Sequence, residues 1–279
     1  MTPSVHEPPA PAAAPPPSAG AASAPTPPAP HALLDGKVVV ITAAAGTGIG
    51  FAAAQRCAEE GAVVVISDAH ERRLGEAADA LAASTGTRPL AVPCNVTVEA
   101  EVQRLYDAAV AEHGRIDVAV NNAGLGGNAP IVDMTDEQWS TVLDITLTGT
   151  FRCTRAVLRH MYAQGSGVVV NNSSVLGWRA QAAQAHYAAA KAGVMALTRC
   201  AAVEAAPHGV RVNAVAPSLA LHPFLNRVFP DDELERLRRA ELFGRSAETW
   251  EVANVMVFLA SDYSSYLSGE VVSVSSQHP

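Results

Sequence analysis

Residues 37–50 read KVVVITAAAGTGIG, and the architecture of the chain can be predicted outward from them. The stretch begins with a run of β-branched residues, passes through three glycines and continues into a segment rich in alanine. A short β-branched run is typical of a strand that is buried on both faces, and glycine allows the chain to turn tightly. We therefore predict a strand at Lys37–Thr42, then a glycine-rich turn and the start of a helix.

The same alternation continues to the end of the chain. Six further β-branched runs are predicted strands: Ala62–Ser67, Leu90–Val92, Asp117–Asn121, Gly167–Asn171, Val210–Val215 and Val271–Val274. Predicted helices lie between them, among them Glu71–Ala83, Glu99–Glu112, Asp136–Ala163 and His186–Ala206. Asp68 and Thr97 are expected to cap two of these helices. This repetition predicts an α/β fold: one doubly wound, Rossmann-type domain with about seven parallel strands and helices on both faces.

The first thirty residues have a different composition. They contain 11 of the 19 prolines and nine alanines, but no Lys or Arg. Proline fixes φ and removes a backbone donor, so this stretch favours an extended, disordered tail. It lacks the positive start and continuous apolar core of a secretory signal. We predict a Pro/Ala-rich tail over residues 1–31 and a single domain over residues 32–279.

Composition excludes several classes of function. The formal net charge of −8 argues against a nucleic-acid surface, which would be basic. The segment Val38–Ala54 carries no charge, but glycines and threonines interrupt it, so no membrane span is predicted. The four cysteines are far apart in the sequence, namely Cys57, Cys94, Cys153 and Cys200. That spacing indicates neither a metal site nor a disulfide framework and suits the cytoplasm.

The predicted first turn is suited to a dinucleotide. Its residues Gly46, Gly48, Ile49 and Gly50 would let the backbone and a helix N-terminus approach a pyrophosphate. Asp68 comes directly after the second predicted strand, where a carboxylate can accept hydrogen bonds from ribose hydroxyls and repel a 2′-phosphate. NAD is therefore favoured over NADP. The alternative for Asp68 is a helix cap, and Arg72 or Arg73 would weaken the preference if either reaches back.

Three further motifs lie on the expected elements. Tyr187 and Lys191 are four residues apart on one predicted helix, so they share a face. Ser174 stands thirteen residues earlier, after a predicted strand, and residues 121–124 read NNAG after another. In this order the motifs resemble the short-chain dehydrogenase/reductase family, and the resemblance covers residues 35–275. It implies a nicotinamide-dependent oxidoreductase that interconverts a secondary alcohol and a ketone.

The resemblance implies a role for each of these residues. Tyr187 would exchange a proton with the substrate oxygen, Ser174 would orient that oxygen, and Lys191 would bind the nicotinamide ribose. Free tyrosine has a pKa of about 10, which is unsuitable for a base near neutral pH. An ammonium ~4 Å away at an effective dielectric of ~20 would favour the phenolate by about 4 kcal/mol, at most about three pKa units.

Other positions carry over from the family pattern, several of them with changes. The remaining implied cofactor contacts are Asn95, Val96, Asn122, Ala123, Gly124, Pro217 and Leu219. Ala44 stands at the usual first glycine in a loop that is one residue longer, and Gly46 is expected to supply the lost flexibility. Thr146 takes the place of the proton-relay asparagine. Its single hydroxyl cannot reproduce an amide, so either it holds a relay water or the relay is arranged otherwise.

The stretch Ser218–Gly244 occupies the position of the variable substrate lid. It combines apolar residues with His222 and arginines (Leu219, Leu221, Phe224, Leu225, Val228, Phe229; Arg227, Arg236, Arg238, Arg239). This mixture indicates a bulky apolar substrate with an anionic handle, and a surface amphipathic helix is the alternative. Trp178 is a candidate wall of the pocket beside Ser174 and Tyr187, with core packing as its alternative. His186 and His222 are expected to be bystanders.

A narrower resemblance rests on the first loop, on residues 67–74 (SDAHERRL) and on residues 268–279 (SGEVVSVSSQHP). These segments are similar to actinobacterial dehydrogenases of steroid-ring degradation, which act on the hydroxyl of a hexahydroindane propanoyl-coenzyme A thioester. The 3-oxoacyl carrier-protein reductases, which normally use NADPH, are the alternative, and a non-catalytic nucleotide sensor is a lesser one. The resemblance also implies a homo-oligomer, a tetramer or dimer, in which the two long helices pair with their copies.

Overall fold

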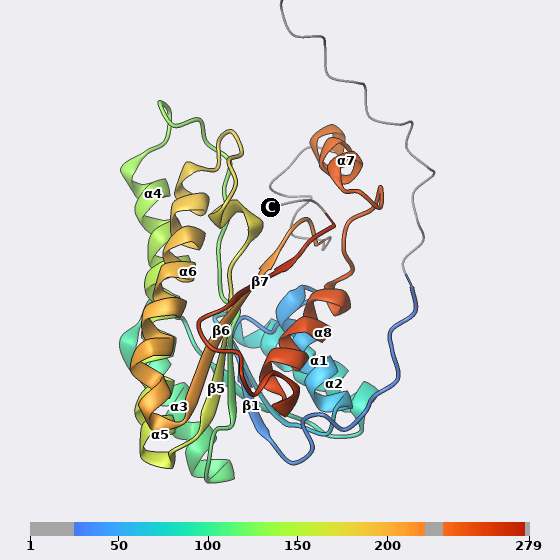
Figure 1. Cartoon of the computed structure of the whole chain (residues 1–279), viewed down its shortest axis with the longest axis vertical. Helices are drawn as coiled ribbons and strands as arrows, with labels where there is room; N and C mark the ends of the chain where they lie inside the picture. The colour runs from blue at the N-terminus through green and yellow to red at the C-terminus, as the bar shows by residue number, and fades with distance from the viewer. Residues whose placement is uncertain (1–24, 221–230, 277–279) are drawn as a thin grey trace, which may run out of the picture.

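The computed structural model describes residues 25–220 and 231–276 and contains one central sheet (Figure 1). Seven parallel strands run in the order β3-β2-β1-β4-β5-β6-β7. Their bounds are β1 Val38–Ile41, β2 Val63–Asp68, β3 Leu90–Pro93, β4 Val118–Asn121, β5 Gly167–Asn172, β6 Val210–Pro217 and β7 Val271–Val274. The predicted doubly wound sheet is therefore confirmed. The order reverses between β1 and β4, which is where such sheets bind ligands.

Helices cover both faces of the sheet, as Figure 1 shows edge-on. One layer contains α1 Ile49–Glu59, α2 Glu71–Thr85 and α8 Thr249–Ala260. The other contains α3 Glu99–His113, α5 Gly149–Gln164 and α6 Ala185–Ala205, with α4 Asp136–Leu143 packed on α6. The helix α7, Asp231–Ala240, lies beyond β7 (Figure 1). Successive strand residues face opposite layers, so a continuous β-branched run fills both cores.

The predicted single helix over Asp136–Ala163 is wrong at its centre. It divides into α4 and α5, because a π-helical turn, η1, occupies Asp144–Thr148. In this turn the N–H of Gly149 donates to the carbonyl of Asp144, five residues back. Such a turn inserts one residue without changing the apolar spacing on either side, so periodicity did not reveal it. Shorter 3₁₀ turns are η2 Val175–Gly177, η3 Ala206–His208 and η5 Asp262–Ser264.

The two predicted helix caps are also wrong. The N-cap of α2 is His70 and that of α3 is Val98, and neither makes a side-chain cap bond. Asp68 still belongs to β2, where it pairs with Pro93, so α2 can begin only after the turn that follows. Thr97 instead donates its hydroxyl to the Asn95 side chain at 2.9 Å.

The chain before β1 makes specific contacts with α1. The backbone N–H groups of His31 and Leu33 donate to Glu60 Oε2 at 2.9 and 3.1 Å. Glu60 in turn pairs with Arg56 at 2.7 Å, and both side chains are buried. The predicted end of the tail at residue 31 thus falls within a segment that is anchored to the domain. Residues 1–24 lie outside the described part of the chain.

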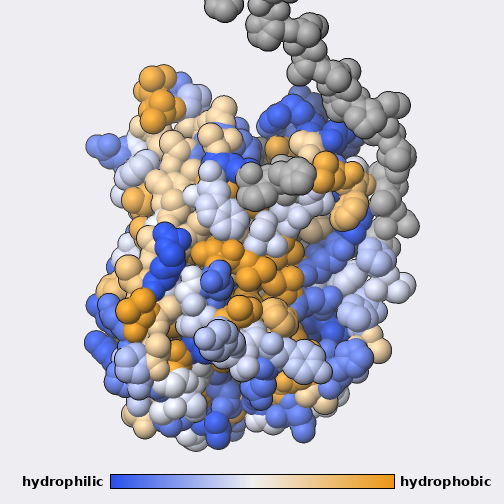
Figure 2. Space-filling model, in the orientation of Figure 1, coloured by the Kyte–Doolittle hydropathy of each residue, from blue (hydrophilic) through white to orange (hydrophobic). Residues whose placement is uncertain are grey.

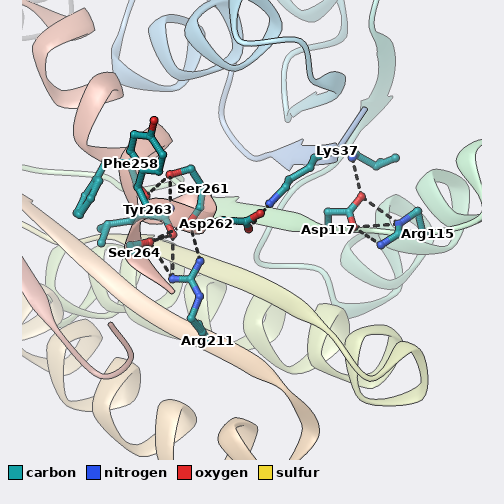
Figure 3. Close-up of polar contacts among 11 residues, drawn as sticks. Lys37, Arg115, Asp117, Arg211, Phe258, Ser261, Asp262, Tyr263 and Ser264 are labelled. Atoms are coloured by element: carbon teal, nitrogen blue, oxygen red, sulfur yellow. Dashed lines mark hydrogen bonds and ion pairs between the residues drawn. The ribbon is translucent and has the colours of Figure 1, made fainter. Parts of the chain in front are cut away.

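Figure 3 shows a polar cluster at the amino-terminal edge of the sheet. Arg211, the second residue of β6, donates to the carbonyls of Leu259 and Ser261 and to the Ser264 hydroxyl, at 3.0–3.1 Å. Lys37, just before β1, pairs with Asp262 at 2.6 Å. These bonds tie the end of α8 to the starts of the strands. They stabilise the fold at the edge opposite the carboxyl ends, where ligands bind in open α/β sheets.

β7 forms one edge of the sheet, and its residues are only partly covered. Figure 2 shows apolar surface in the middle of this face, over the last strand.

Within residues 25–220 and 231–276, no helix is both long and apolar enough to cross a membrane. The same residues contain no cluster of His, Cys, Asp and Glu side chains that could hold a metal ion.

Candidate active site

The loop between β1 and α1 forms the first wall of the site. Ala43 adopts a φ of +52° and Gly46 a φ of +91°, both in the left-handed region. Ala44 is buried, and its N–H donates to the Ser67 carbonyl at 2.9 Å. The family pattern placed the missing first glycine at Ala44. The structure instead has the strained backbone at Ala43, so that is the position where glycine would relieve strain. Gly46 does take up a conformation that favours glycine, as expected.

This loop leaves room for a bulky anion beside the start of α1. A Cβ atom added at Gly46 or Gly48 would meet no atom within 4 Å. One added at Gly50 would lie 2.3 Å from the Ala43 carbonyl oxygen, so glycine is required there for close packing. Gly48, the N-cap of α1, has no side chain to cap the first N–H groups of the helix, and the space beside it is open. These features fit the pyrophosphate of a dinucleotide.

Asp68 lies beside the same loop, at the end of β2. Its Oδ2 accepts the N–H of Ala45 at 3.4 Å, and its side chain is 12% exposed. Arg73 does reach back, because its Nη2 is 3.9 Å from Asp68 Oδ1, whereas Arg72 pairs with Glu76 at 2.6 Å. The Asp68 carboxylate is therefore positioned to accept hydrogen bonds from a ribose, with the Arg73 guanidinium nearby.

Asn95 and Val96 follow β3 and differ in what they can offer a ligand. Asn95 is exposed, and its Oδ1 accepts bonds from the backbone and hydroxyl of Thr97, which leaves its amide N–H group for another partner. Val96 is buried, and its side chain packs where a Cβ on Gly149 would fall. Only the backbone of Val96 is therefore positioned for the predicted cofactor contact.

The NNAG loop after β4 is tied to the loop after β1. Asn122 Nδ2 donates to the carbonyls of Thr42 and Ala43 at 3.3 and 3.1 Å. The Thr42 hydroxyl accepts the N–H groups of Asn122 and Ala123 at 3.0 and 3.2 Å. A Cβ on Gly124 would lie 3.3 Å from Lys191 Nζ, so glycine lets this loop approach the lysine. Sequence reasoning did not single out Thr42. The signal available in the sequence was a hydroxyl residue at the end of the first predicted strand.

Ser174, Tyr187 and Lys191 meet beyond the carboxyl end of β5. Ser174 is buried just after the strand, and its hydroxyl hydrogen-bonds the Tyr187 phenol. Lys191 Nζ donates to the carbonyl of Asn172 at 2.6 Å and lies 5.5 Å from the centre of the Tyr187 ring. One turn of α6 places the phenol and the amine on a common face, as their spacing predicts. The fold thus brings the three predicted catalytic residues together.

The titration behaviour differs from the sequence-based expectation. Burial raises the pKa of Tyr187 to about 12, and the hydrogen bond from Ser174 acts in the opposite direction. Burial also lowers the pKa of Lys191 to about 7. The expected depression of the phenol pKa by Lys191 is not present, because the same desolvation disfavours the phenolate and the ammonium. Near neutral pH the chain therefore holds a protonated Tyr187.

Thr146 uses its single hydroxyl twice. The hydroxyl accepts the N–H of Leu125 at 2.9 Å and donates to the carbonyl of the same residue at 3.2 Å. The residue is fully buried in the π-helical turn, and its own carbonyl accepts the Thr150 hydroxyl at 2.7 Å. A hydroxyl can donate and accept at once, so it supplies both bonds that hold the loop after Gly124. This geometry assigns Thr146 a positioning role.

The predicted substrate side includes Trp178 and the residues at the end of β6. Trp178 is 43% exposed, which argues against the core-packing alternative. Pro217 is buried, and the Leu219 N–H reaches Glu241 Oε1 at 3.4 Å. His186 is buried, and its Nδ1 accepts the N–H of Tyr187. The lid residues at 221–230, including His222 and Arg227, lie outside the described residues.

The arginines of α7 have partners on their own helix. Arg236 pairs with Glu233 at 2.5 Å, and both Arg238 and Arg239 lie within 3.6 Å of Glu235. These are exposed ion pairs between neighbouring turns, which contribute little to stability and can be exchanged for another anion. They are compatible with an anionic handle on the substrate but do not by themselves indicate one.

Comparisons with known proteins agree with this geometry. Residues 43–276 match the protein family described as enoyl-(acyl carrier protein) reductase. A (5R,7aS)-5-hydroxy-7a-methyl-1-oxo-2,3,5,6,7,7a-hexahydro-1H-indene-carboxyl-CoA reductase of Mycobacterium tuberculosis is 63% identical, over 90% of this chain and 96% of that protein. A 3-oxoacyl-[acyl-carrier-protein] reductase of Thermotoga maritima is 39% identical over 86% and 97%. A crystal structure of a short chain dehydrogenase from Mycobacterium smegmatis is 56% identical, with a TM-score of 0.82 over 92% and 99%.

Proposed function

The chain belongs to the short-chain dehydrogenase/reductase family, and on that premise we propose that it interconverts a ring hydroxyl and a ketone on a bicyclic coenzyme A thioester, with NAD as redox partner. That the protein is an oxidoreductase follows from the family. The observation that supports the chemistry best is the hydrogen-bonded pair of Ser174 and Tyr187 with Lys191 one turn further along α6.

The residues of the chain divide the work of the reaction. When bound, the nicotinamide cofactor supplies or accepts the hydride at the reacting carbon. Tyr187 donates a proton to the carbonyl oxygen during reduction and takes it back during oxidation. The Ser174 hydroxyl would orient that oxygen, and Lys191, whose amine donates to the Asn172 carbonyl, would hold the ribose side of the cofactor. Because burial raises the pKa of Tyr187, the folded chain presents the acid that reduction needs.

NAD is the proposed cofactor because of Asp68. Its carboxylate lies beside the loop that fits a pyrophosphate, so a 2′-phosphate at this place would meet a like charge. Arg73, 3.9 Å away, reduces this repulsion in part. NADP remains the alternative, and it is the cofactor that 3-oxoacyl carrier-protein reductases normally use.

Replacing Asp68 by alanine should raise the affinity for NADPH relative to NADH roughly tenfold, because the like charge is removed while Arg73 remains. The ratio of the two dissociation constants, measured by nucleotide fluorescence, checks this. Arg72→Ala is the matched control, since Arg72 pairs with Glu76 and should leave the ratio unchanged. An unchanged ratio in Asp68→Ala would remove the carboxylate from the adenosine site.

The substrate class follows from the 63% identical relative. The compound in its name carries a hydroxyl, a ketone and a coenzyme A thioester on a bicyclic indene, with a carboxyl in place of the propanoyl group that the sequence resemblance implied. Support from this chain is the exposed Trp178 next to Ser174, which offers an apolar wall to a ring system. A 3-oxoacyl thioester is the alternative substrate, which the Thermotoga maritima relative supports.

A panel of thioesters separates these substrates. With the hydroxyindane coenzyme A thioester and NAD⁺, we expect formation of reduced nicotinamide with a kcat/KM at least about tenfold above that for a 3-hydroxyacyl thioester. Acetoacetyl-coenzyme A with NADPH is the competing assay. Faster turnover in the competing assay would favour the 3-oxoacyl alternative. Turnover in neither assay, together with nucleotide binding, would favour a nucleotide sensor.

A homo-oligomer in the cytoplasm is the remaining proposal. Its support is the exposed apolar surface on the helices that were expected to pair, such as Trp139 on α4, Phe151 on α5 and Val203 on α6. Four cysteines without disulfides are compatible with a reducing compartment.

A further inference from the structure

Asn172, the last residue of β5, contains a buried amide oxygen that has no hydrogen-bond partner among residues 25–220 and 231–276. The side chain is only 8% exposed, and its Oδ1 is sealed from solvent. Its Nδ2 donates to Asn122 Oδ1 at 2.8 Å. Buried polar atoms are nearly always paired, because leaving one unpaired costs about 1–3 kcal/mol. The unpaired oxygen therefore requires an explanation.

The orientation of this amide follows from the network around it. Asn122 Nδ2 faces the carbonyls of Thr42 and Ala43, which can only accept hydrogen bonds. Asn122 must therefore present its oxygen to Asn172, and Asn172 must answer with its nitrogen. Rotating the Asn172 amide by half a turn would bring two oxygens together. The unpaired group is thus an acceptor, and none of the described residues donates to it.

The alternation of β5 places this acceptor on the nucleotide side of the sheet. Val168 and Val170 pack in the layer of α1 and α8, so Asn172 lies on the same face. Asn171, by contrast, faces the opposite layer and donates to Thr198 of α6. The first N–H groups of α1 belong to the face of Asn172. The acceptor is therefore set at the carboxyl end of β5, on the side of the glycine loop.

The backbone of the same residue is bonded to the predicted ribose-binding lysine. Lys191 Nζ donates to the Asn172 carbonyl at 2.6 Å. Asn172 therefore contains both the unpaired side-chain oxygen and the carbonyl that binds the lysine amine. Asn122 joins it to the loop after β1. Asp68, at the proposed adenosine end, is the last residue of β2, and two strands lie between β2 and β5 in the sheet. Asn172 therefore belongs to the nicotinamide half of the proposed binding site.

We propose that Asn172 Oδ1 binds the nicotinamide half of the cofactor by accepting a hydrogen bond from an N–H or O–H group of the nicotinamide riboside. The inference rests on the proposed function, because it needs a dinucleotide at this edge. Binding supplies the missing donor and relieves the unpaired acceptor, so the residue favours the nicotinamide nucleotide over fragments that lack the ring.

The test compares two ligands on one variant. Asn172→Leu keeps the side-chain volume and removes the acceptor. NADH should bind it about tenfold more weakly, the equivalent of a lost hydrogen bond, while ADP-ribose, which lacks nicotinamide, should bind as tightly as to the wild type. Isothermal titration gives both dissociation constants without turnover. An unchanged NADH constant, or equal weakening of both ligands, would overturn the proposal.

Two further variants make the result specific. Asn172→Val also lacks the acceptor and suits a strand, so it serves if the leucine variant does not fold. Asn213→Leu removes another buried asparagine, on the neighbouring strand β6, where Leu267 and Glu270 satisfy its amide. This control should lose stability without changing the ratio of the NADH and ADP-ribose constants. If the ratio changes as much as in Asn172→Leu, the proposal is overturned.

The outcome is separable from that of the proposed function. If the wild type binds NADH and Asn172→Leu binds it equally well, only the role of Asn172 is lost. If the wild type binds neither NADH nor NADPH, the proposed oxidoreductase function fails first, and the role of Asn172 fails with it. Where NADPH binds more tightly than NADH, the same comparison uses NADPH and 2′-phospho-ADP-ribose.

Discussion

Tyr187→Phe should reduce kcat/KM about a thousandfold while the dissociation constant for NADH stays close to the wild-type value. The variant retains the ring, which lies close to Gly126, and loses only the hydroxyl that hydrogen-bonds Ser174. A positioned general acid contributes about 10²–10⁴-fold to the rate. The hydroxyl of Ser174, which hydrogen-bonds the phenol, cannot take over this role, because an aliphatic alcohol is a far weaker acid than a phenol.

Steady-state kinetics and nucleotide titration on the same preparation check this expectation. Tyr263→Phe is the matched control, because Tyr263 is 76% exposed near the opposite edge of the sheet and should leave both constants unchanged. Near-wild-type turnover by Tyr187→Phe would exclude the tyrosine as the proton donor. A large loss of NADH binding would instead assign the hydroxyl mainly to the cofactor.

Lys191→Met should abolish most turnover and yet make the folded protein more stable at pH 6–7. The Lys191 side chain is 3% exposed, and among the described residues its amine donates one hydrogen bond, to the Asn172 carbonyl. Burial lowers the pKa from 10.5 to about 7, so folding must desolvate or deprotonate the amine. Methionine has a similar length and carries no charge, so it removes that cost and loses one hydrogen bond.

The sign of the pH dependence follows from proton binding. Below pH 7 both states bind the proton, and the folded state bears the full desolvation cost, at most about 5 kcal/mol. Between about pH 7 and 10.5 the unfolded chain binds more protons, so the free energy of unfolding of the wild type rises with pH. The advantage of Lys191→Met should therefore be largest near pH 6.5 and shrink steadily toward pH 9.5.

Thermal unfolding across this pH range measures the effect. After the lost hydrogen bond is allowed for, we expect the melting temperature to rise by roughly 3–6 °C at pH 6.5. The chain contains only one other lysine, Lys37, which pairs with Asp262 at the surface. Lys37→Met should be neutral or slightly destabilising at every pH. A Lys191→Met variant that melts lower than the wild type at pH 6.5 would contradict the buried, desolvated amine.

Much of the architecture was predictable because it depends on local patterns. β-branched runs such as Val38–Ile41 mark strands buried on both faces, and the alternation with helices implies parallel pairing. The spacing of Tyr187 and Lys191 was sufficient to place them on one helix face. The glycine loop and Asp68 were assigned to the ends of the first two strands, where the structure has them.

The errors occur where a contact between distant segments outweighs a local preference. The helix over residues 136–163 was predicted without its π turn, which presents Thr146 to a loop twenty-one residues away. Asp68 was expected to cap a helix, but pairing with β3 keeps it in the strand. Leu125 and Thr146 illustrate the general reason. The Thr146 hydroxyl can make the two hydrogen bonds that an asparagine side chain would make only because the fold brings the Leu125 backbone to it.

The kinds of residue and their order along the chain were therefore enough for the family and the sheet, and for proposing Tyr187 as the proton donor, since these depend on periodicity and on motifs of a few residues. The fold alone decided the protonation of Tyr187 and Lys191, because desolvation depends on everything packed around a group. It also left the Asn172 side-chain oxygen without a partner, because this depends on the neighbours that tertiary structure brings to it, here residues that follow β4 and β1.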